Sequence, residues 1–108
     1  MNKPKRAKSK SIAQIKINGR TYSIRATIHS LQRMKERNVD EYVVTGCIIA
    51  LGHDRLLDLQ KREAEAIIID RDKGVSVVIG FTLNKIKVIT VIDKSDVFVK
   101  SGTEITTI

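Results

Sequence analysis

The chain has 108 residues, which suffices for one compact domain with its own core and excludes two. Hydrophobic residues make up 42% of the chain, but tryptophan is absent and aromatic residues contribute only 4%, so we expect an aliphatic core. No run of about 18 apolar residues occurs and no apolar segment follows the basic start, which argues against a transmembrane helix and a signal peptide. The single cysteine, Cys47, cannot form an internal disulfide, which suits a reducing compartment. Together with the missing apolar segments, this leads us to expect a cytoplasmic protein without a membrane partner.

The formal net charge of +8 is concentrated at one end of the chain. Residues 1–37 contain 11 of the 20 Lys and Arg residues and one acid, Glu36, whereas residues 38–108 carry nine bases and 11 acids. A basic end on a nearly neutral body favours a polyanionic partner, because each neutralised phosphate releases counterions. We therefore expect nucleic acid as the partner, RNA rather than DNA, although a solvated tail or a surface for an acidic protein would give the same pattern.

The first 11 residues predict a disordered basic arm, because they have five bases, no acid and the chain's only proline. Residues 12–108 are predicted to form a single α+β domain. The candidate nucleic-acid-binding residues are the bases of the arm and of the strands that follow it: Lys3, Lys5, Arg6, Lys8, Lys10, Arg20 and Arg25.

Residues 12–26 predict a β-hairpin. Two segments of alternating polarity, 12–17 and 21–26, are joined by Asn18-Gly19. Both of these residue types tolerate a positive φ, which the tight turn of a hairpin requires. The domain is therefore expected to open with two antiparallel strands.

Two helices are predicted after the hairpin. The first starts at Thr27 or Ser30 and ends before Asn38. Asn38, with a glutamate three residues later, resembles a capping box and starts the second helix, which is apolar, mostly buried and ends at Gly52. The segment 53–62 fits a loop with a short helical turn or a strand, and stays unassigned.

From Glu63 the pattern changes to strands. Three β segments in residues 63–92 follow one another with short turns, which predicts an antiparallel meander. Residues 96–108 either add an edge strand or return over the sheet. This order predicts an α+β fold in which two helices pack on one face of a curved antiparallel sheet of about four strands.

The first predicted helix carries an apolar and a basic stripe on nearly opposite sides, at about 100° per residue. The apolar stripe suits the core. The basic stripe is either a solvated face or a surface that binds a polyanion. In the second case two guanidinium groups would bind one phosphate, and the nearby imidazole could exchange a proton. Phosphodiester cleavage without a metal needs these parts. The two stripes consist of Ile28, Leu31 and Met34, and of His29, Arg33 and Arg37.

The stretch "IHSLQRMKERNV", followed by a short apolar helix and by "GVSVVIGFTLNKIKVITVIDKSD", resembles a known family. Its histidine at a helix start, its Arg-Met pair, its second arginine one turn later and its late strand with a threonine resemble the domain-of-unknown-function family four-two-five-eight. That family is similar to the ribonuclease-toxin superfamily that groups barnase, EndoU, the tRNA-cleaving colicins and RelE, with two helices on a curved four-stranded sheet. The resemblance covers roughly Thr21 to Asp93.

The resemblance implies a metal-independent RNA endonuclease, in which the 2′-hydroxyl attacks the adjacent phosphorus. His29 would act as acid or base, while Arg33 and Arg37 would clamp the phosphate. Thr90 would donate a positioning hydrogen bond, although threonine is also a good strand former and needs no further role. The chain departs from the family pattern at Ile92, where an aromatic residue is common, and few aromatic residues remain for base stacking.

Other residue combinations point to structure rather than chemistry. Cys47 is predicted to be a buried core residue, and Asp70 and Asp72 to shape a turn rather than bind a metal. No zinc spacing, phosphate-binding glycine loop or nucleotide fingerprint occurs, so no metal and no cofactor are predicted. Two functions without catalysis stay open: a module of a mobile element that binds DNA, RNA or a host protein, and an inhibitor that docks on an acidic protein. A toxin would also have an antitoxin or a host factor as protein partner.

Overall fold

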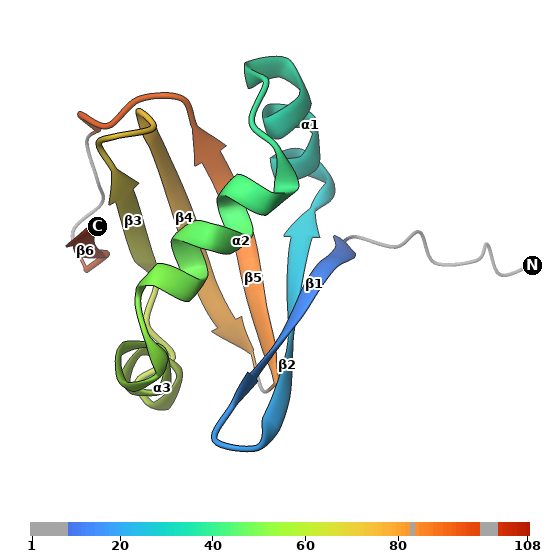
Figure 1. Cartoon of the computed structure of the whole chain (residues 1–108), viewed down its shortest axis with the longest axis vertical. Coiled ribbons are helices and arrows are strands. Elements are labelled where there is room, and N and C mark those ends of the chain that lie inside the picture. The colour runs from blue at the N-terminus through green and yellow to red at the C-terminus, as the bar shows by residue number, and fades with distance from the viewer. Residues whose placement is uncertain (1–8, 83, 98–101) are drawn as a thin grey trace, which may run out of the picture.

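The computed structural model describes residues 9–82, 84–97 and 102–108. In this part of the chain two strands are followed by three helices and then by four strands (Figure 1). The predicted α+β class is confirmed, with one helix and two strands more than expected. The elements are β1 (Ser9–Ile17), β2 (Arg20–Thr27), α1 (Ile28–Arg37), α2 (Glu41–Ala50), α3 (His53–Lys61), β3 (Ala66–Asp70), β4 (Val75–Thr82), β5 (Lys85–Ile92) and β6 (Glu104–Thr107).

The strands form one mixed sheet in the order β1-β2-β5-β4-β3-β6. The predicted hairpin of β1 and β2 and the predicted meander of β3, β4 and β5 are both present and antiparallel. β2 pairs with β5 in parallel, and so does β3 with β6, which the sequence did not predict. Parallel strands need a long crossover connection, and the segment between β2 and β5 contains all three helices.

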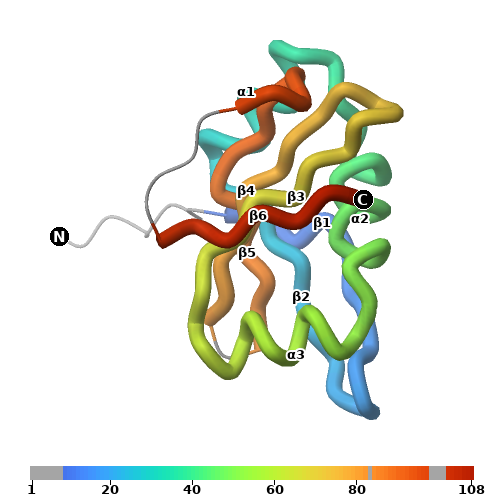
Figure 2. Tube along the Cα trace, turned by 90° about the vertical axis from the view of Figure 1, so that its left-hand side faces the viewer, coloured from blue at the N-terminus to red at the C-terminus, as the bar shows by residue number. Residues whose placement is uncertain are grey.

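The helices cover one face of the sheet (Figures 1 and 2). Every second residue of a strand points to this side, where it meets the apolar side chains of the helices. Full burial of one such aliphatic side chain contributes about 1.5–3 kcal/mol. The resulting core is mainly aliphatic, as expected, and includes Tyr22, Ile24, Met34, Val44, Ile48, Leu56, Leu59, Ile68, Val77, Ile86 and Val88.

The hairpin turn has the predicted conformation, because Asn18 and Gly19 have φ values of 50° and 80°. β1 starts at Ser9, earlier than the domain boundary expected at residue 12. The reason is Arg25 of β2, whose guanidinium donates hydrogen bonds to the hydroxyl of Ser9 at 2.8 Å and to its carbonyl at 2.9 Å. The rest of the predicted arm, residues 1–8, lies outside the described residues.

The boundary between the first two helices differs from the prediction. Asn38 is left-handed, with a φ of 60°, and its N–H donates to the carbonyl of Lys35, so it ends α1 instead of capping α2. Asp40 takes the N-cap position of α2 and makes no side-chain capping bond. α2 ends at Ala50, and Gly52, with a φ of 85°, leads into α3.

The segment that the sequence left unassigned forms α3. Leu56 and Leu59 lie three residues apart on its inner side and are buried in the core. His53 and Asp54, at the start of the helix, are exposed. A helix of this length with two buried leucines depends on packing against the sheet rather than on its own propensity.

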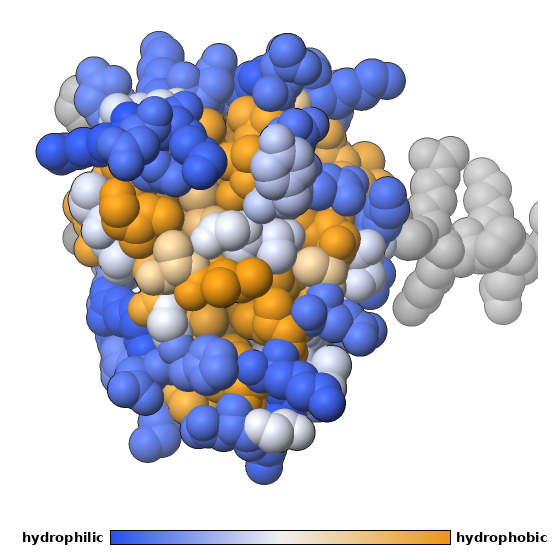
Figure 3. Space-filling view, in the orientation of Figure 1, coloured by the Kyte–Doolittle hydropathy of each residue, from blue (hydrophilic) through white to orange (hydrophobic). Residues whose placement is uncertain are grey.

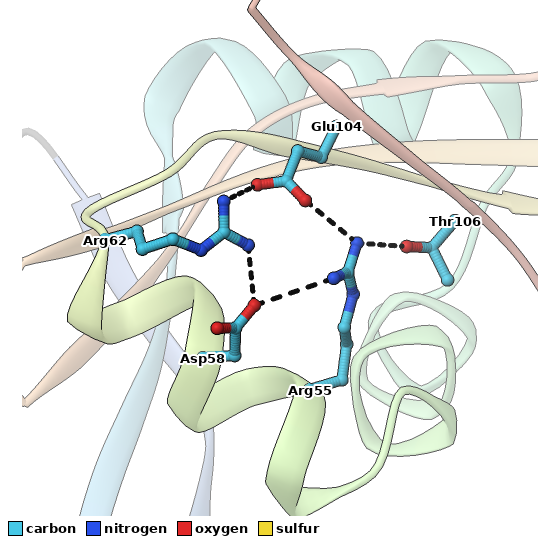
Figure 4. A network of polar contacts seen from close by, with 5 residues as sticks. All are labelled: Arg55, Asp58, Arg62, Glu104 and Thr106. Carbon is cyan, nitrogen blue, oxygen red and sulfur yellow. Dashed lines mark hydrogen bonds and ion pairs between the residues drawn. The ribbon is translucent and has the colours of Figure 1, made fainter.

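α3 holds the edge strand β6 through a network of ion pairs (Figure 4). Glu104 of β6 accepts hydrogen bonds from Arg55 and Arg62. Asp58 pairs with the same two arginines, and Arg55 also donates to the hydroxyl of Thr106. The hydrogen bond from Arg62 is the main reason why the pKa values of Glu104 and Asp58 lie below their ordinary values.

Acid is expected to loosen β6 before the rest of the sheet. A carboxylate with a lowered pKa stabilises the folded chain above its ordinary pKa, and this contribution is lost as the pH falls through the folded value. Because the ordinary pKa of Glu104 is 4.5, the hydrogen-exchange protection of the β6 amides should fall below about pH 4. Glu104→Gln should lower it already at neutral pH, whereas Glu63→Gln should not. Unchanged protection in Glu104→Gln would contradict this role.

Candidate nucleic-acid interface

α1 is turned relative to the orientation that its apolar stripe predicts. Met34 is buried and Leu31 packs against the core, as predicted, but Ser30 is also buried, whereas Ile28, expected in the core, is 54% exposed. The hydroxyl of Thr27 accepts the N–H of Ser30 and donates to the carbonyl of Ile89 on β5. The hydroxyl of Ser30 donates to the carbonyl of Thr27. These polar contacts place Ser30, rather than Ile28, against the sheet.

This rotation changes the environment of the basic stripe. Arg37 reaches the end of β5, where its guanidinium donates to the carbonyl of Val91 and lies 3.7 Å from a carboxylate oxygen of Asp93. Arg33 pairs with Glu36 of the same helix at 2.7 Å. Two of the three cationic candidates therefore have partners within the chain. The third, the histidine of the first turn at position 29, is exposed.

Thr90 lies on the sheet and not beside the core side of α1. β5 has a bulge at Ile89, because Val78 of β4 pairs with Thr90 while the next residue of β4 pairs with Val88. After the bulge Val91 is fully buried in the core, so its neighbour Thr90 points to the face away from the helices. The candidate catalytic residues thus belong to two elements, three to α1 and one to the uncovered face of β5.

The uncovered face of β1, β2 and β5 is polar and basic. Because side chains alternate along a strand, the residues between the core positions point away from the helices. The contacts agree, since the hydroxyls of Ser11 and Ser23 meet at 3.2 Å across β1 and β2, and Arg25 lies beside Lys87 of β5. We call this surface the polar sheet face; it consists of Ser9, Ser11, Gln14, Lys16, Thr21, Ser23, Arg25, Lys85 and Lys87.

The polar sheet face holds four basic residues and no acidic one. Arg25 and Lys87 are cross-strand neighbours on strands about 4.8 Å apart, and Lys85 lies two residues before Lys87 on the same face. One acidic residue borders this face: Glu65, whose Cγ lies 3.8 Å from the place that a Cβ would take on Gly80, the β4 partner of Lys87. Neighbouring cations repel each other, so they favour an anion placed over them.

On the same side of the sheet, β3 and the start of β4 are buried. Ile67 and Ile69 of β3 point to it and are 1% and 7% exposed. The hydroxyl of Ser76 on β4 donates to the carbonyl of Lys94 at 2.6 Å, which fixes the chain after β5 to this side. Among the described strands, the basic residues of this sheet face therefore lie on β1, β2 and β5.

The structure separates the bases that were predicted to bind nucleic acid. Arg25 lies on the polar sheet face, Arg20 is exposed at the start of β2, and Lys10 lies 3.7 Å from Glu41 of α2. Four others lie outside the described residues: Lys3, Lys5, Arg6 and Lys8. Three bases of the face are missing from the prediction: Lys16, Lys85 and Lys87. The alternation of lysine with isoleucine around them was the signal for a polar strand face.

The residues that the sequence assigned to structure have structural roles. Cys47 is buried, as predicted, and burial is the main cause that raises the pKa of its thiol to about 11, so it is no nucleophile at neutral pH. Asp70 accepts the N–H of Lys73 at 3.1 Å within the turn between β3 and β4. In the part of the chain that the structure describes, no three His, Cys, Asp or Glu side chains are placed to hold a metal ion. None of the helices described there is long and apolar enough to cross a bilayer.

None of the protein-family models, curated proteins and solved structures compared with the chain matches it. Any function therefore depends on the geometry of the polar sheet face and of α1.

Arg37 is expected to stabilise the fold and Arg33 is not. Arg37→Ala leaves the carbonyl of Val91 without its charged donor, and should lower the free energy of unfolding by about 1–3 kcal/mol. Arg33→Ala removes only an exposed pair with Glu36 and should change it by no more than about 0.5 kcal/mol. Chemical denaturation of both variants measures the difference. Equal losses would show that the contact of Arg37 with β5 contributes nothing.

Proposed function

We propose that the protein binds nucleic acid, and RNA in preference to DNA, through the polar sheet face. The observation that carries this proposal is the grouping of four bases on a face made of three strands, with no acid among its residues and Glu65 at its border. Strands from both ends of the chain contribute to the grouping. Such a surface attracts a polyanion and releases its counterions on contact.

The chemistry of the face favours contacts to the sugar-phosphate backbone. Lysine and arginine bind phosphate oxygens, while the serine, threonine and glutamine side chains can hydrogen-bond to phosphate and to the ribose 2′-hydroxyl. The face has no aromatic residue on which a base could stack. Tyr22 is buried on the opposite side, where its hydroxyl donates to Gln60. We therefore expect binding that tolerates any base sequence and depends strongly on salt.

The four bases that precede Ser9 in the sequence would add to the same interface. They are linked to β1 at Ser9, which Arg25 fixes on the polar sheet face. An attached basic segment adds phosphate contacts without a built pocket. Removal of residues 1–8 should accordingly weaken binding for all sequences alike.

Charge reversal of the two lysines of β5 tests the interface most directly. Lys85→Glu combined with Lys87→Glu should weaken binding to a mixed RNA pool at least tenfold, and should reduce the slope of log K against log salt by about 2. Lys61→Glu combined with Lys73→Glu changes the net charge equally on exposed residues elsewhere. Fluorescence anisotropy over a salt series measures both. If the two pairs of substitutions weakened binding equally, the effect would come from net charge alone, and the polar sheet face would not be the interface.

A second candidate function is metal-independent RNA cleavage, as the family resemblance implies. It is favoured by Thr90, which points to the same sheet face as Lys87, and by the exposed imidazole of His29. In this proposal His29 exchanges the proton of the 2′-hydroxyl or of the leaving oxygen, and Arg33 binds the phosphate. Arg37, with its guanidinium on the carbonyl of Val91, would act mainly by orienting α1.

Cleavage is tested by comparing the two histidines of the chain. With chelator present, wild-type protein and His53→Ala, which changes an exposed histidine of α3, should cleave a mixed RNA pool. His29→Ala should lose about 100-fold or more in rate while it keeps its affinity for RNA. Absence of cleavage by wild-type protein that binds RNA would leave binding as the function. Cleavage unchanged in His29→Ala would exclude the assigned acid or base.

A further inference from the structure

α2 is apolar on both of its sides. Val44 and Ile48 face the core, whereas Tyr42 and Ile49 are 74% and 55% exposed. A helix that is apolar all round normally lies between two packed layers, but α2 has the sheet on one side only (Figure 1). Its outer side is therefore an apolar surface that residues 9–82, 84–97 and 102–108 leave uncovered.

We call this surface the α2 face; it consists of Tyr42, Thr45, Gly46 and Ile49, which follow the spacing of one side of a helix. A Cβ on Gly46 would meet no other atom within 4 Å, so another backbone can approach closely there. An open groove of about 850 Å³ continues the face towards α1 and β1, where Leu31 and Ile12 line it. Figure 3 shows apolar side chains gathered across the middle of this side of the molecule, over α2.

The charge distribution selects the partner. α2 carries one formal charge, Glu41, and Lys10 of the same chain lies 3.7 Å from it. The groove beside the α2 face is also lined by Lys35, Asp40 and Glu41, so one base and two acids border an uncharged centre, which offers nothing to a nucleic acid or to an acidic protein. In contrast, two copies of a chain with a net charge of +8 repel each other least through a surface that carries no net positive charge. A second copy of the chain is therefore the occupant that this surface fits.

We propose that two copies form a two-fold dimer by antiparallel packing of α2 on α2. The midpoint between Thr45 and Gly46 is also the midpoint between Tyr42 and Ile49. A two-fold axis at this point sets Tyr42 of each copy over Ile49 of the other, and Gly46 over Thr45. Large side chains thus meet at the ends of the contact and small ones at its centre, where the backbones come closest.

The dimer is independent of the proposed function and compatible with it. The polar sheet face lies on the side of the sheet away from α2, so pairing through α2 leaves this face accessible in both copies. Antiparallel helices also place each positive N-terminal end beside a negative C-terminal end, which is favourable.

The mass of the protein in solution tests the dimer. Sedimentation equilibrium is measured on protein stripped of nucleic acid, over a wide concentration range, because bound nucleic acid could itself bridge copies. The wild-type mass should rise from 12.1 kDa towards twice that value. Ile49→Glu and Gly46→Glu should weaken the dimer at least tenfold, since each buries an unpaired charge in the contact. Ile28→Glu changes an equally exposed isoleucine outside the α2 face and should dimerise like wild type.

Mixing two variants tests the geometry of the contact. Tyr42→Glu and Ile49→Lys should each dimerise poorly alone, but an equimolar mixture should form heterodimers, because the new charges face each other across the axis. A mixture of Tyr42→Glu and Tyr42→Lys should not recover, since position 42 does not meet itself. A wild-type protein that stays monomeric at every concentration would overturn the dimer, as would equal weakening by Ile28→Glu. If the mixture of Tyr42→Glu and Tyr42→Lys formed heterodimers and the mixture of Tyr42→Glu and Ile49→Lys did not, the antiparallel arrangement would be wrong. Circular dichroism confirms that each variant is folded.

Discussion

The parallel pairing of β2 with β5 is the contact on which the rest of the structure depends. It joins the N-terminal hairpin to the meander, and closing so long a segment of chain costs conformational entropy. On the helix side the register brings Ile24 to Ile86 and Ala26 to Val88, whose burial offsets that cost. On the other side the same register sets Arg25 beside Lys87. A slip of one residue would exchange the two faces, so the core and the basic surface are fixed together.

The parts of the fold that local signals control could be predicted from the sequence. The turn at Asn18-Gly19 requires positive φ values, which these residues tolerate, and the strands of the meander are separated by short turns. The burial of Cys47 followed from its place in an apolar run. The parallel pairs and the edge strand β6 escaped firm prediction, because each joins segments that are distant in sequence and carries no local mark.

The candidate sites were less predictable, because polar contacts at a distance overrode the local pattern. The stripe of Ile28, Leu31 and Met34 indicated the buried side of α1 correctly for Leu31 and Met34, but the hydroxyl of Thr27 turns the helix so that Ser30 rather than Ile28 faces the sheet. Asn38 has the residue type of a helix start, yet the left-handed conformation that it also favours ends α1. The lysines of β5 form part of a basic surface only because β2, which carries Arg25, pairs beside them in parallel. No local pattern in the sequence indicates that these two distant strands are neighbours.

The α2 face and the polar sheet face lie on opposite sides of the sheet. The helix side also carries the charged residues of α1 and α3, but the α2 face itself has no charge. Such a division lets one molecule meet an anion and an apolar surface at the same time without competition between them. It also means that substitutions on one side can be interpreted without concern for the other, because the packed core separates them.

The strand β6 has a consequence for aggregation as well as for stability. It covers the edge of β3, whose sequence "AIIID" contains three consecutive isoleucines. An uncovered edge of this composition can pair with strands of other chains and seed fibrous assemblies. By holding Glu104, the side chains of Arg55 and Arg62 therefore make the openings of β6 that expose this edge rarer. Ion pairs that contribute little to the free energy of unfolding can in this way limit the aggregation of the protein at high concentration.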